Sequence, residues 1–435
     1  MTDFTSLGLS DQLQKAILAN GYTEPTPIQR DAIPHILNGD DLMGLAQTGT
    51  GKTAAFGLPL IDKLLAEGTK APARGTRALI LAPTRELVNQ IAKNLVSFVK
   101  GSPLRVNNVV GGVSINGQIK RLERGTDILV ATPGRLLDLV ERKAIRLDTA
   151  GFLVLDEADQ MLDLGFIHAL RKIASLVAKK RQTLLFSATM PRQIEDLSKT
   201  YLRDPIRVEV APAGRTADKV KQIVHFMGQK AKTDFLTNLM CERPDDISLV
   251  FCRTKHGAER LMKKLVSCGI SAGSIHGNKS QNQRERAIKG LREGEIKVLV
   301  ATDVAARGID IPGVSHVYNF ELPEVPEAYV HRIGRTARAG ADGDAVALCA
   351  PEEIGLLRQI EKLTGNRIEV VSGEVPPESA SRPARSGGRG KPSSSRGHNG
   401  NKSRKAAPKG GAKADAGNRQ RRNGGRSQGG RPAAA

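Results

Sequence analysis

A run of residues near position 50 has the composition of a phosphate-binding loop. Two glycines, Gly49 and Gly51, lead directly into Lys52 and Thr53, and a short apolar segment precedes them. Glycine lets the backbone close around phosphate oxygens, lysine supplies positive charge, and the threonine hydroxyl is suited to bind magnesium. A helix that begins near Lys52 would also point its N-terminal amides at the same phosphates. We therefore predict a nucleotide site made of Ala46, Gln47, Thr48, Gly49, Thr50, Gly51, Lys52 and Thr53.

An acidic pair supplies the second half of this chemistry. Asp156 and Glu157 follow the apolar run 152–155, and parallel sheets carry such residues to the ligand crevice at the ends of their strands. We expect Asp156 to hold magnesium and Glu157 to orient and deprotonate an attacking water. An isolated Asp-Glu pair often does no more than cap a helix, but together with Lys52 the pair indicates nucleotide hydrolysis.

The segments that must position these residues read as two α/β units. Continuous apolar runs alternate with helical patterns, which is typical of a parallel sheet covered on both faces. A Pro/Gly-containing stretch separates the two series. We predict a first domain at 1–210, a linker at 211–218, a second domain at 219–372 and a disordered tail at 373–435. Strands are expected at 42–46, 78–82, 106–110, 128–131, 152–155, 183–186 and 206–210, and then at 220–226, 248–251, 272–275, 297–301, 314–319 and 344–348.

The charge of the chain points to a polyanionic partner. The 435 residues carry a formal net charge of +21, and +12 of it lies between Glu374 and Ala435, where 15 Lys and Arg face 3 Asp and Glu. Such a Gly-, Ser- and Arg-rich segment buries too little apolar surface to fold. We expect it to add weak, salt-sensitive affinity for RNA, although a solvated solubility segment is the simpler alternative.

Neither a metal framework nor a membrane is indicated. The four cysteines lack C-x-x-C spacing, which suits a reducing cytosol. The N-terminus lacks a basic region followed by an apolar run, and no apolar run of about 18 residues occurs. We expect a cytoplasmic protein with no membrane contact.

The acidic motif extends to Asp156-Glu157-Ala158-Asp159, and with this extension the chain resembles the DEAD-box ATP-dependent RNA helicases. The resemblance covers roughly residues 4–360 and implies two tandem RecA-like domains with ATP and Mg2+ as cofactors. Within 21–29, Tyr22 and Gln29 match the motif of the family that reads adenine, and a Gln amide can donate to and accept from the adenine edge. Ser187 and Thr189 match the motif that couples ATP to RNA, although a strand-end turn alone would explain them.

The remaining family motifs predict an RNA surface. By resemblance, RNA contacts in the first domain are Pro83, Thr84, Arg85, Gly112, Thr132, Pro133, Gly134 and Arg135, and those in the second are Arg253, Thr254, Thr302 and Asp303. These residue types suit phosphate and sugar contacts rather than base edges. Aromatic residues make up only 3% of the chain, which also favours backbone gripping over base stacking. We therefore expect RNA binding that is largely independent of sequence.

The resemblance places the last catalytic residues in the second domain. Asp310 is expected near the ATP ribose, and Arg335 and Arg338 are expected to act as arginine fingers from one face of a helix. Arg332 by itself suits a solvated basic helix face. The family usually has Gly where Ala337 stands; because alanine is a good helix former, we expect it to be tolerated. The run 275–281 and the short basic tail resemble the bacterial RhlE-like branch.

These features predict an RNA-stimulated ATPase that separates short RNA duplexes locally and non-processively, or remodels ribonucleoproteins. Two alternatives stay open: an ATP-gated RNA clamp or scaffold with incidental unwinding, and a DNA translocase of the same architecture. Ribosomal or RNA-decay proteins are possible partners, and the sequence ranks no pathway above another.

Overall fold

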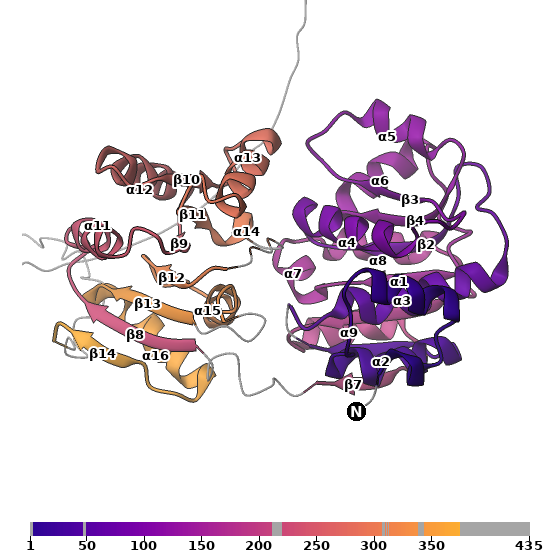
Figure 1. The fold of residues 1–435 in the computed structure, drawn as a ribbon, viewed down its shortest axis with the longest axis horizontal. Helices are drawn as coiled ribbons and strands as arrows, with labels where there is room; N and C mark the ends of the chain where they lie inside the picture. The colour runs from indigo at the N-terminus through magenta and orange to yellow at the C-terminus, as the bar shows by residue number, and fades with distance from the viewer. Residues whose placement is uncertain are drawn as a thin grey trace, which may run out of the picture. The chain divides into compact units, whose positions relative to one another are not determined.

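The computed structural model describes residues 3–46, 49–210, 220–306, 309, 311, 313–337 and 343–374. The predicted linker at 211–218 lies outside these ranges, as does the predicted tail from residue 375 onward. The described part contains two seven-stranded sheets in which every paired strand runs parallel (Figure 1). The predicted fold class, two tandem RecA-like domains, is confirmed. The exact domain boundaries remain a prediction.

The first sheet has the strand order β3-β4-β2-β5-β6-β1-β7. Its central strands are short, mostly apolar segments in which every residue is buried, because helices cover both faces of the sheet. The elements are η1 Phe4–Leu7, α1 Asp11–Ala19, α2 Pro27–Asn38, β1 Leu42–Leu45, α3 Lys52–Glu67, β2 Thr76–Leu81, α4 Arg85–Phe98, β3 Val106–Val109, α5 Ile115–Leu122, β4 Thr126–Ala131, α6 Pro133–Glu141, β5 Phe152–Leu155, α7 Ala158–Asp163, α8 Ile167–Leu176, β6 Gln182–Ser187, α9 Arg192–Tyr201 and β7 Ile206–Glu209.

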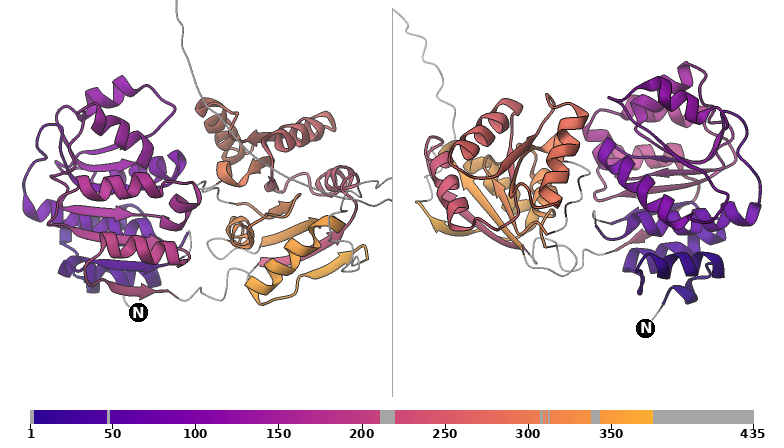
Figure 2. Two further views of the ribbon diagram at one scale, coloured as in Figure 1. Left: turned by 180° about the vertical axis from the view of Figure 1, so that it is seen from behind. Right: turned by 45° about the horizontal axis from the view of Figure 1, so that its top comes forward.

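Alternate residues of each strand feed separate cores on the two faces of this sheet. In β2, Ile80 packs into a core with residues of α1 to α4, whereas Leu79 and Leu81 pack into a core with residues of α6, α8 and α9. Figure 2 shows these helices on opposite sides of the sheet. Because both faces are buried, the strands are held rigidly and their carboxyl ends become fixed platforms for side chains.

The second sheet repeats the plan with the order β10-β11-β9-β12-β13-β8-β14. Helices α11 and α12 cover one face, and α13 to α16 cover the other. The elements are β8 Val220–Phe226, α11 Lys232–Glu242, β9 Ser248–Cys252, α12 Lys255–Ser267, β10 Ala272–Ile275, α13 Gln281–Arg292, β11 Val298–Thr302, α14 Asp303–Ala306, β12 His316–Asn319, α15 Pro326–Ile333, β13 Gly343–Cys349, η2 Pro351–Glu353, α16 Ile354–Thr364 and β14 Glu369–Ser372.

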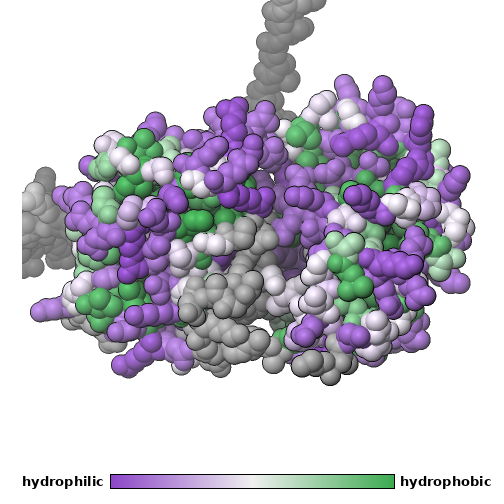
Figure 3. Space-filling view, in the orientation of Figure 1, coloured by the Kyte–Doolittle hydropathy of each residue, from purple (hydrophilic) through white to green (hydrophobic). Residues whose placement is uncertain are grey.

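Every strand expected from the sequence is present, with ends shifted by at most two residues. The expected strand at 78–82, for example, is Thr76–Leu81, because the polar start of the strand lacked an apolar signal. One strand was missed: all four residues of β14 are exposed, so no burial pattern marked it. Hydrophilic side chains cover much of the surface seen in Figure 3. Within the described ranges, no helix has the length and apolarity that crossing a membrane requires.

Candidate active site

The phosphate-binding loop forms between β1 and α3, as the glycine spacing predicts. Gly49 and Gly51 have φ of +88° and +91°, a region that glycine adopts without strain. A Cβ on Gly51 would lie 2.4 Å from the side-chain nitrogen of Gln29, so this position also has no room for a side chain. Lys52 is the first residue of α3, which places the helix amides beside the loop. Gln47 and Thr48 lie outside the described residues.

Lys52 connects the loop to the acidic pair. Its buried ammonium group donates to the carbonyl of Ala46 at 3.1 Å and lies 3.8 Å from Oδ1 of Asp156. Lys52, Thr53, Asp156 and Glu157 all line one cavity of about 190 Å³, together with Tyr22, Gly49, Gly51, Ala54, Leu87, Gln90, Asn94, Ile309 and Arg335. The structure therefore brings together the residues that the sequence assigned to phosphate, metal and water.

The acidic pair sits directly after β5 in a strained turn. Glu157 has φ of +53°, an uncommon conformation for a residue with a side chain, and it immediately precedes α7 without a side-chain capping hydrogen bond. Such strain is tolerated where the surrounding structure fixes a functional side chain. Burial raises the pKa of Asp156 to about 6, and the charge of Glu157 acts in the same direction while that of Lys52 opposes it. A cation bound next to Asp156 would favour its charged form.

Asp159, the last acid of the motif, is a functional residue that the sequence analysis left without a role. Its Oδ2 accepts hydrogen bonds from the backbone N–H groups of Ala188 (3.1 Å) and Thr189 (2.9 Å) and from the Thr189 hydroxyl (3.0 Å). Ser187 in turn donates to the Thr189 carbonyl at 2.7 Å. The acidic motif and the Ser187-to-Thr189 loop are thus one hydrogen-bonded unit. The sequence did carry a sign of this role, because Asp159 is the fourth residue of the acidic motif.

Gln29 is placed beside the phosphate loop, and its amide already has partners. The side chain is 1% exposed; its Oε1 accepts from the Thr26 N–H at 2.9 Å and its Nε2 donates to the Gly51 carbonyl at 3.1 Å. Through these two bonds Gln29 ties the start of α2 to the loop. Tyr22 reaches the cavity, and its ring packs against Phe98 with a centroid distance of 5.5 Å. The adenine contact predicted for Gln29 remains a prediction.

Except for Gly112, the RNA residues predicted in the first domain lie at two helix N-termini. Thr84 caps α4 by accepting from the Leu87 N–H at 3.2 Å. Thr132 holds the corresponding position before α6, which Pro133 begins, but its side chain makes no capping hydrogen bond. Pro83 and Gly134 belong to these two turns. Arg85 packs its guanidinium on Gly112, where an added Cβ would lie 1.8 Å from Nη1, and burial lowers the pKa of Arg85. Arg135 donates to the Val113 carbonyl at 3.1 Å.

In the second domain, Arg253 and Thr254 follow β9, while Thr302 ends β11 and Asp303 begins α14. Thr254 caps α12 through the Gly257 N–H at 3.0 Å. Asp303 accepts two hydrogen bonds from Arg332, at 2.5 and 2.7 Å, so its carboxylate is already paired.

The interpretation of Arg332 as a solvated basic residue is wrong. Its side chain is 1% exposed, and besides Asp303 it donates to Oδ1 of Asn319 (3.0 Å) and the Glu321 carbonyl (2.7 Å). The guanidinium also lies over the Phe251 ring, 5.0 Å from its centroid. Helical spacing alone could not reveal this, because the partners come from β9, β12 and α14.

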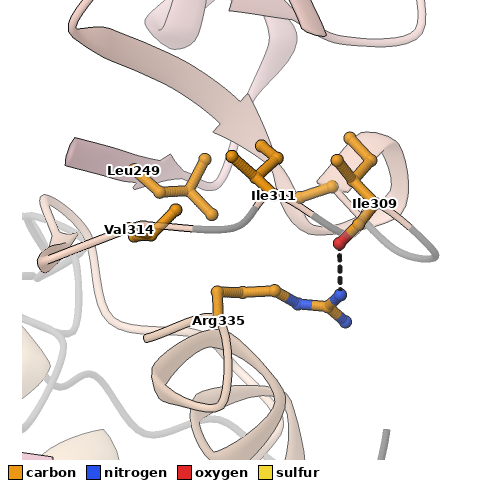
Figure 4. Close-up of a pocket in the computed structure, with 6 residues that line it drawn as sticks. Leu249, Ile309, Ile311, Val314 and Arg335 are labelled. Atoms are coloured by element: carbon orange, nitrogen blue, oxygen red, sulfur yellow. Dashed lines mark hydrogen bonds between the residues drawn. The ribbon is translucent and has the colours of Figure 1, made fainter. Parts of the chain in front are cut away.

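Arg335 reaches the nucleotide cavity, but not from a helix. Helix α15 ends at Ile333, so the prediction that Arg335 and Arg338 share one helical face is wrong for Arg335. Its Nη1 donates to the Ile309 carbonyl at 2.7 Å. Figure 4 shows the guanidinium below Ile309, in a pocket that Leu249, Ile311 and Val314 also line. Arg338 and Asp310 lie outside the described residues.

The reasoning about Ala337 also needs correction. Ala337 has φ of +53° and lies after α15, so its helix propensity is irrelevant there. Glycine is the residue that adopts such a conformation without strain, which gives a physical reason for glycine at this position.

Comparison with known proteins agrees with this geometry. The DEAD/DEAH box helicase family matches residues 26–197, and the helicase conserved C-terminal domain matches residues 231–340. The DEAD-box ATP-dependent RNA helicase CshA of Bacillus cereus is 44% identical over 369 residues, which cover 85% of this chain and 69% of CshA.

Two solved structures show the same architecture. Dbp5 of S. cerevisiae bound to RNA and ADP BeF3 superposes with a TM-score of 0.77 at 33% identity, covering 86% of this chain and 96% of Dbp5. Mss116p bound to single-stranded RNA and AMP-PNP gives 0.76 at 26% identity, covering 87% of this chain and 81% of Mss116p. The assembled cavity, the two matched domains and the identity to CshA show that the chain belongs to the DEAD-box ATP-dependent RNA helicase family.

Proposed function

We propose that the chain hydrolyses ATP in the cavity at the ends of β1 and β5 and uses the cycle to separate short RNA duplexes locally and non-processively. One observation carries the proposal: a single cavity is lined by Lys52, Thr53, Asp156, Glu157 and Arg335. Lys52 supplies a positive charge for the phosphates, and Thr53 and Asp156 supply two oxygen ligands. Glu157 supplies a base and Arg335 a second positive charge, which completes the set that phosphoryl transfer requires.

Each residue has a separate task in this scheme. Lys52 and the first amides of α3 bind the phosphates, and Glu157 accepts a proton from the attacking water. Arg335 neutralises charge that develops on the transferred phosphoryl group, and Arg338 is proposed to assist it. Thr53 and Asp156 offer the hard oxygen ligands that magnesium prefers, and the buried Asp156 carboxylate fits such a cation. When bound, Mg2+ neutralises phosphate charge and orients the phosphates.

The base and the sugar would be bound at the other end of the cavity. We assign Tyr22 and Gln29 to the adenine and Asp310 to the ribose, following the family resemblance. RNA would be held through its backbone by the predicted contacts at the strand ends of both sheets, which present threonine hydroxyls, helix N-termini and arginines. Ribosomal or RNA-decay proteins as partners and the RhlE-like branch rest on that resemblance alone. The cytoplasm as location rests on the cysteine pattern, which suits a reducing compartment.

The test is steady-state ATP hydrolysis without nucleic acid, with single-stranded RNA and with DNA of the same sequence, using Lys52→Ala as the blank. We expect RNA, but not DNA, to stimulate ATP hydrolysis. Equal stimulation by DNA would favour a translocase, and no stimulation by RNA would refute the proposed coupling.

Glu157→Gln separates the helicase from the clamp. Removing a general base lowers turnover by about 100-fold or more, so both ATP hydrolysis and repeated duplex release should be lost while ATP-dependent RNA binding is kept. Glu141→Gln, which alters an exposed glutamate of the same domain, is the matched control. A Glu157→Gln protein that still performs its full RNA function would identify the clamp instead.

A further inference from the structure

A buried carboxylate ties together three neighbouring strand ends of the second sheet. Glu353, at the end of η2, is 3% exposed. Its Oε1 accepts from Nη2 of Arg253 (2.9 Å) and from the Leu322 N–H (3.1 Å). Its Oε2 accepts from the Ala350 N–H (3.0 Å) and from the Lys232 ammonium group. The donors other than Lys232 come from the segments just after β9, β12 and β13, which are adjacent in the sheet.

Lys232 completes the charge balance of this network. Its side chain is fully buried at the start of α11, where it donates to Glu353 and to the Phe320 carbonyl at 3.0 Å. Burying a lysine and a glutamate together costs desolvation energy that apolar residues would not incur, so stability alone is weak grounds for such a pair. The pair does, however, fix the Glu353 carboxylate in one orientation.

Arg253 is the member of the network that reaches the surface. Its side chain is 34% exposed, and its backbone N–H donates to Oε2 of Glu321 at 2.8 Å, which fixes the start of the turn. A guanidinium carries five N–H groups in a planar fork. Because Glu353 binds Nη2, the guanidinium is held in one plane. It lies at the carboxyl end of β9, next to the end of β11, where Thr302 is found.

We propose that Glu353, held by Lys232, is a positioning residue that orients Arg253 toward an RNA phosphate. The proposal rests on the proposed function and adds to it a residue that need not touch RNA. Without the Glu353 carboxylate, Arg253 would keep its charge but lose the fixed plane of its fork. RNA would then be bound more weakly, while the rate of ATP hydrolysis at saturating RNA would change little.

The experiment compares RNA-stimulated ATPase of the full chain with that of Glu353→Gln, varying the concentration of single-stranded RNA at saturating ATP. Loss of a charge-assisted hydrogen bond is expected to raise the half-saturating RNA concentration about tenfold, with kcat within about twofold. Glu352→Gln is the control, because Glu352 is the exposed neighbour of Glu353 and is expected to leave both values unchanged.

A double-mutant cycle distinguishes positioning from general damage. In an Arg253→Ala background, Glu353→Gln should raise the half-saturating concentration no further. Arg253→Lys alters only a partly exposed side chain, so it is expected to fold even if Glu353→Gln does not. It keeps the charge but not the fork, and should show a similar rise. Melting curves set the assay temperature below the transition of each variant.

The outcomes are separable. Suppose that RNA stimulates the unmodified chain and that the half-saturating RNA concentration is unchanged in both Glu353→Gln and Arg253→Lys. This result would refute the positioning role and leave the proposed function intact. An additional rise in the Arg253→Ala background would also refute it, since Glu353 would then act through another group. Absence of RNA stimulation in the unmodified chain would refute the proposed function and the role of Arg253 with it.

Discussion

The hydrogen bonds around Asp159 allow a quantitative prediction for Asp159→Asn. In the structure the two carboxylate oxygens accept four hydrogen bonds, one from the Gln160 N–H at 3.0 Å and three from Ala188 and Thr189. An asparagine of the same shape has one oxygen, so its NH₂ group must face a backbone donor on one side. At least one bond is lost, and the others change from charge-assisted to neutral.

The size of the effect follows from these losses. A hydrogen bond to a charged group contributes about 1.5–3 kcal/mol, and a neutral one about 1 kcal/mol. Because the neutral side chain is also easier to bury, the net loss is expected to be about 2–3 kcal/mol. The loss falls first on the Ser187-to-Thr189 loop, which Asp159 ties to the acidic motif.

Hydrogen exchange measures this loss where it occurs. The amides of Ala188 and Thr189 should exchange at least about 30-fold faster in Asp159→Asn, since about 2 kcal/mol corresponds to that factor. Urea unfolding should show a matching decrease. Asp148→Asn, which changes an aspartate in an exposed ion pair with Arg146, is the control and should be nearly neutral. Unchanged exchange at both amides in Asp159→Asn would refute the view that Asp159 holds the loop.

Two further predictions concern the second domain. Ala337→Gly should raise the free energy of unfolding by about 0.5–1 kcal/mol, because glycine relieves the positive φ, and thermal denaturation would show it; a decrease would contradict the backbone argument. Glu259 accepts from Lys279, His276 and Ser274, and these contacts lower its pKa to about 2. Its stabilising contribution should therefore be complete above pH 5 and be lost as pH falls from about 4.5 to 2. Glu259→Gln should lower the free energy of unfolding by about 1–2 kcal/mol at pH 7, a value discounted for partial exposure, and by about half of that at pH 3. Urea titrations at the two pH values measure the difference, and a cost that does not depend on pH would be evidence against the ion pairs.

The sequence by itself determined the α/β architecture and the centre of the nucleotide site. Strands buried on both faces are continuous apolar runs, and these runs located thirteen of the fourteen strands that the structure describes. The loop from Ala46 to Thr53 and the pair Asp156 and Glu157 are recognisable locally, because each is a short motif at a strand end whose chemistry depends on a few adjacent residues.

Tertiary structure decided how residues far apart in the chain share their charges. Asp159 binds a loop 30 residues away, Arg332 is buried against Asp303 and Asn319, and Glu353 joins Arg253 across 100 residues. Spacing along a helix gives no information about such partners, because the strands that carry them become neighbours only in the folded sheet. The positive φ of Ala337 and the end of α15 before Arg335 likewise differ from the helix that the sequence pattern predicted there.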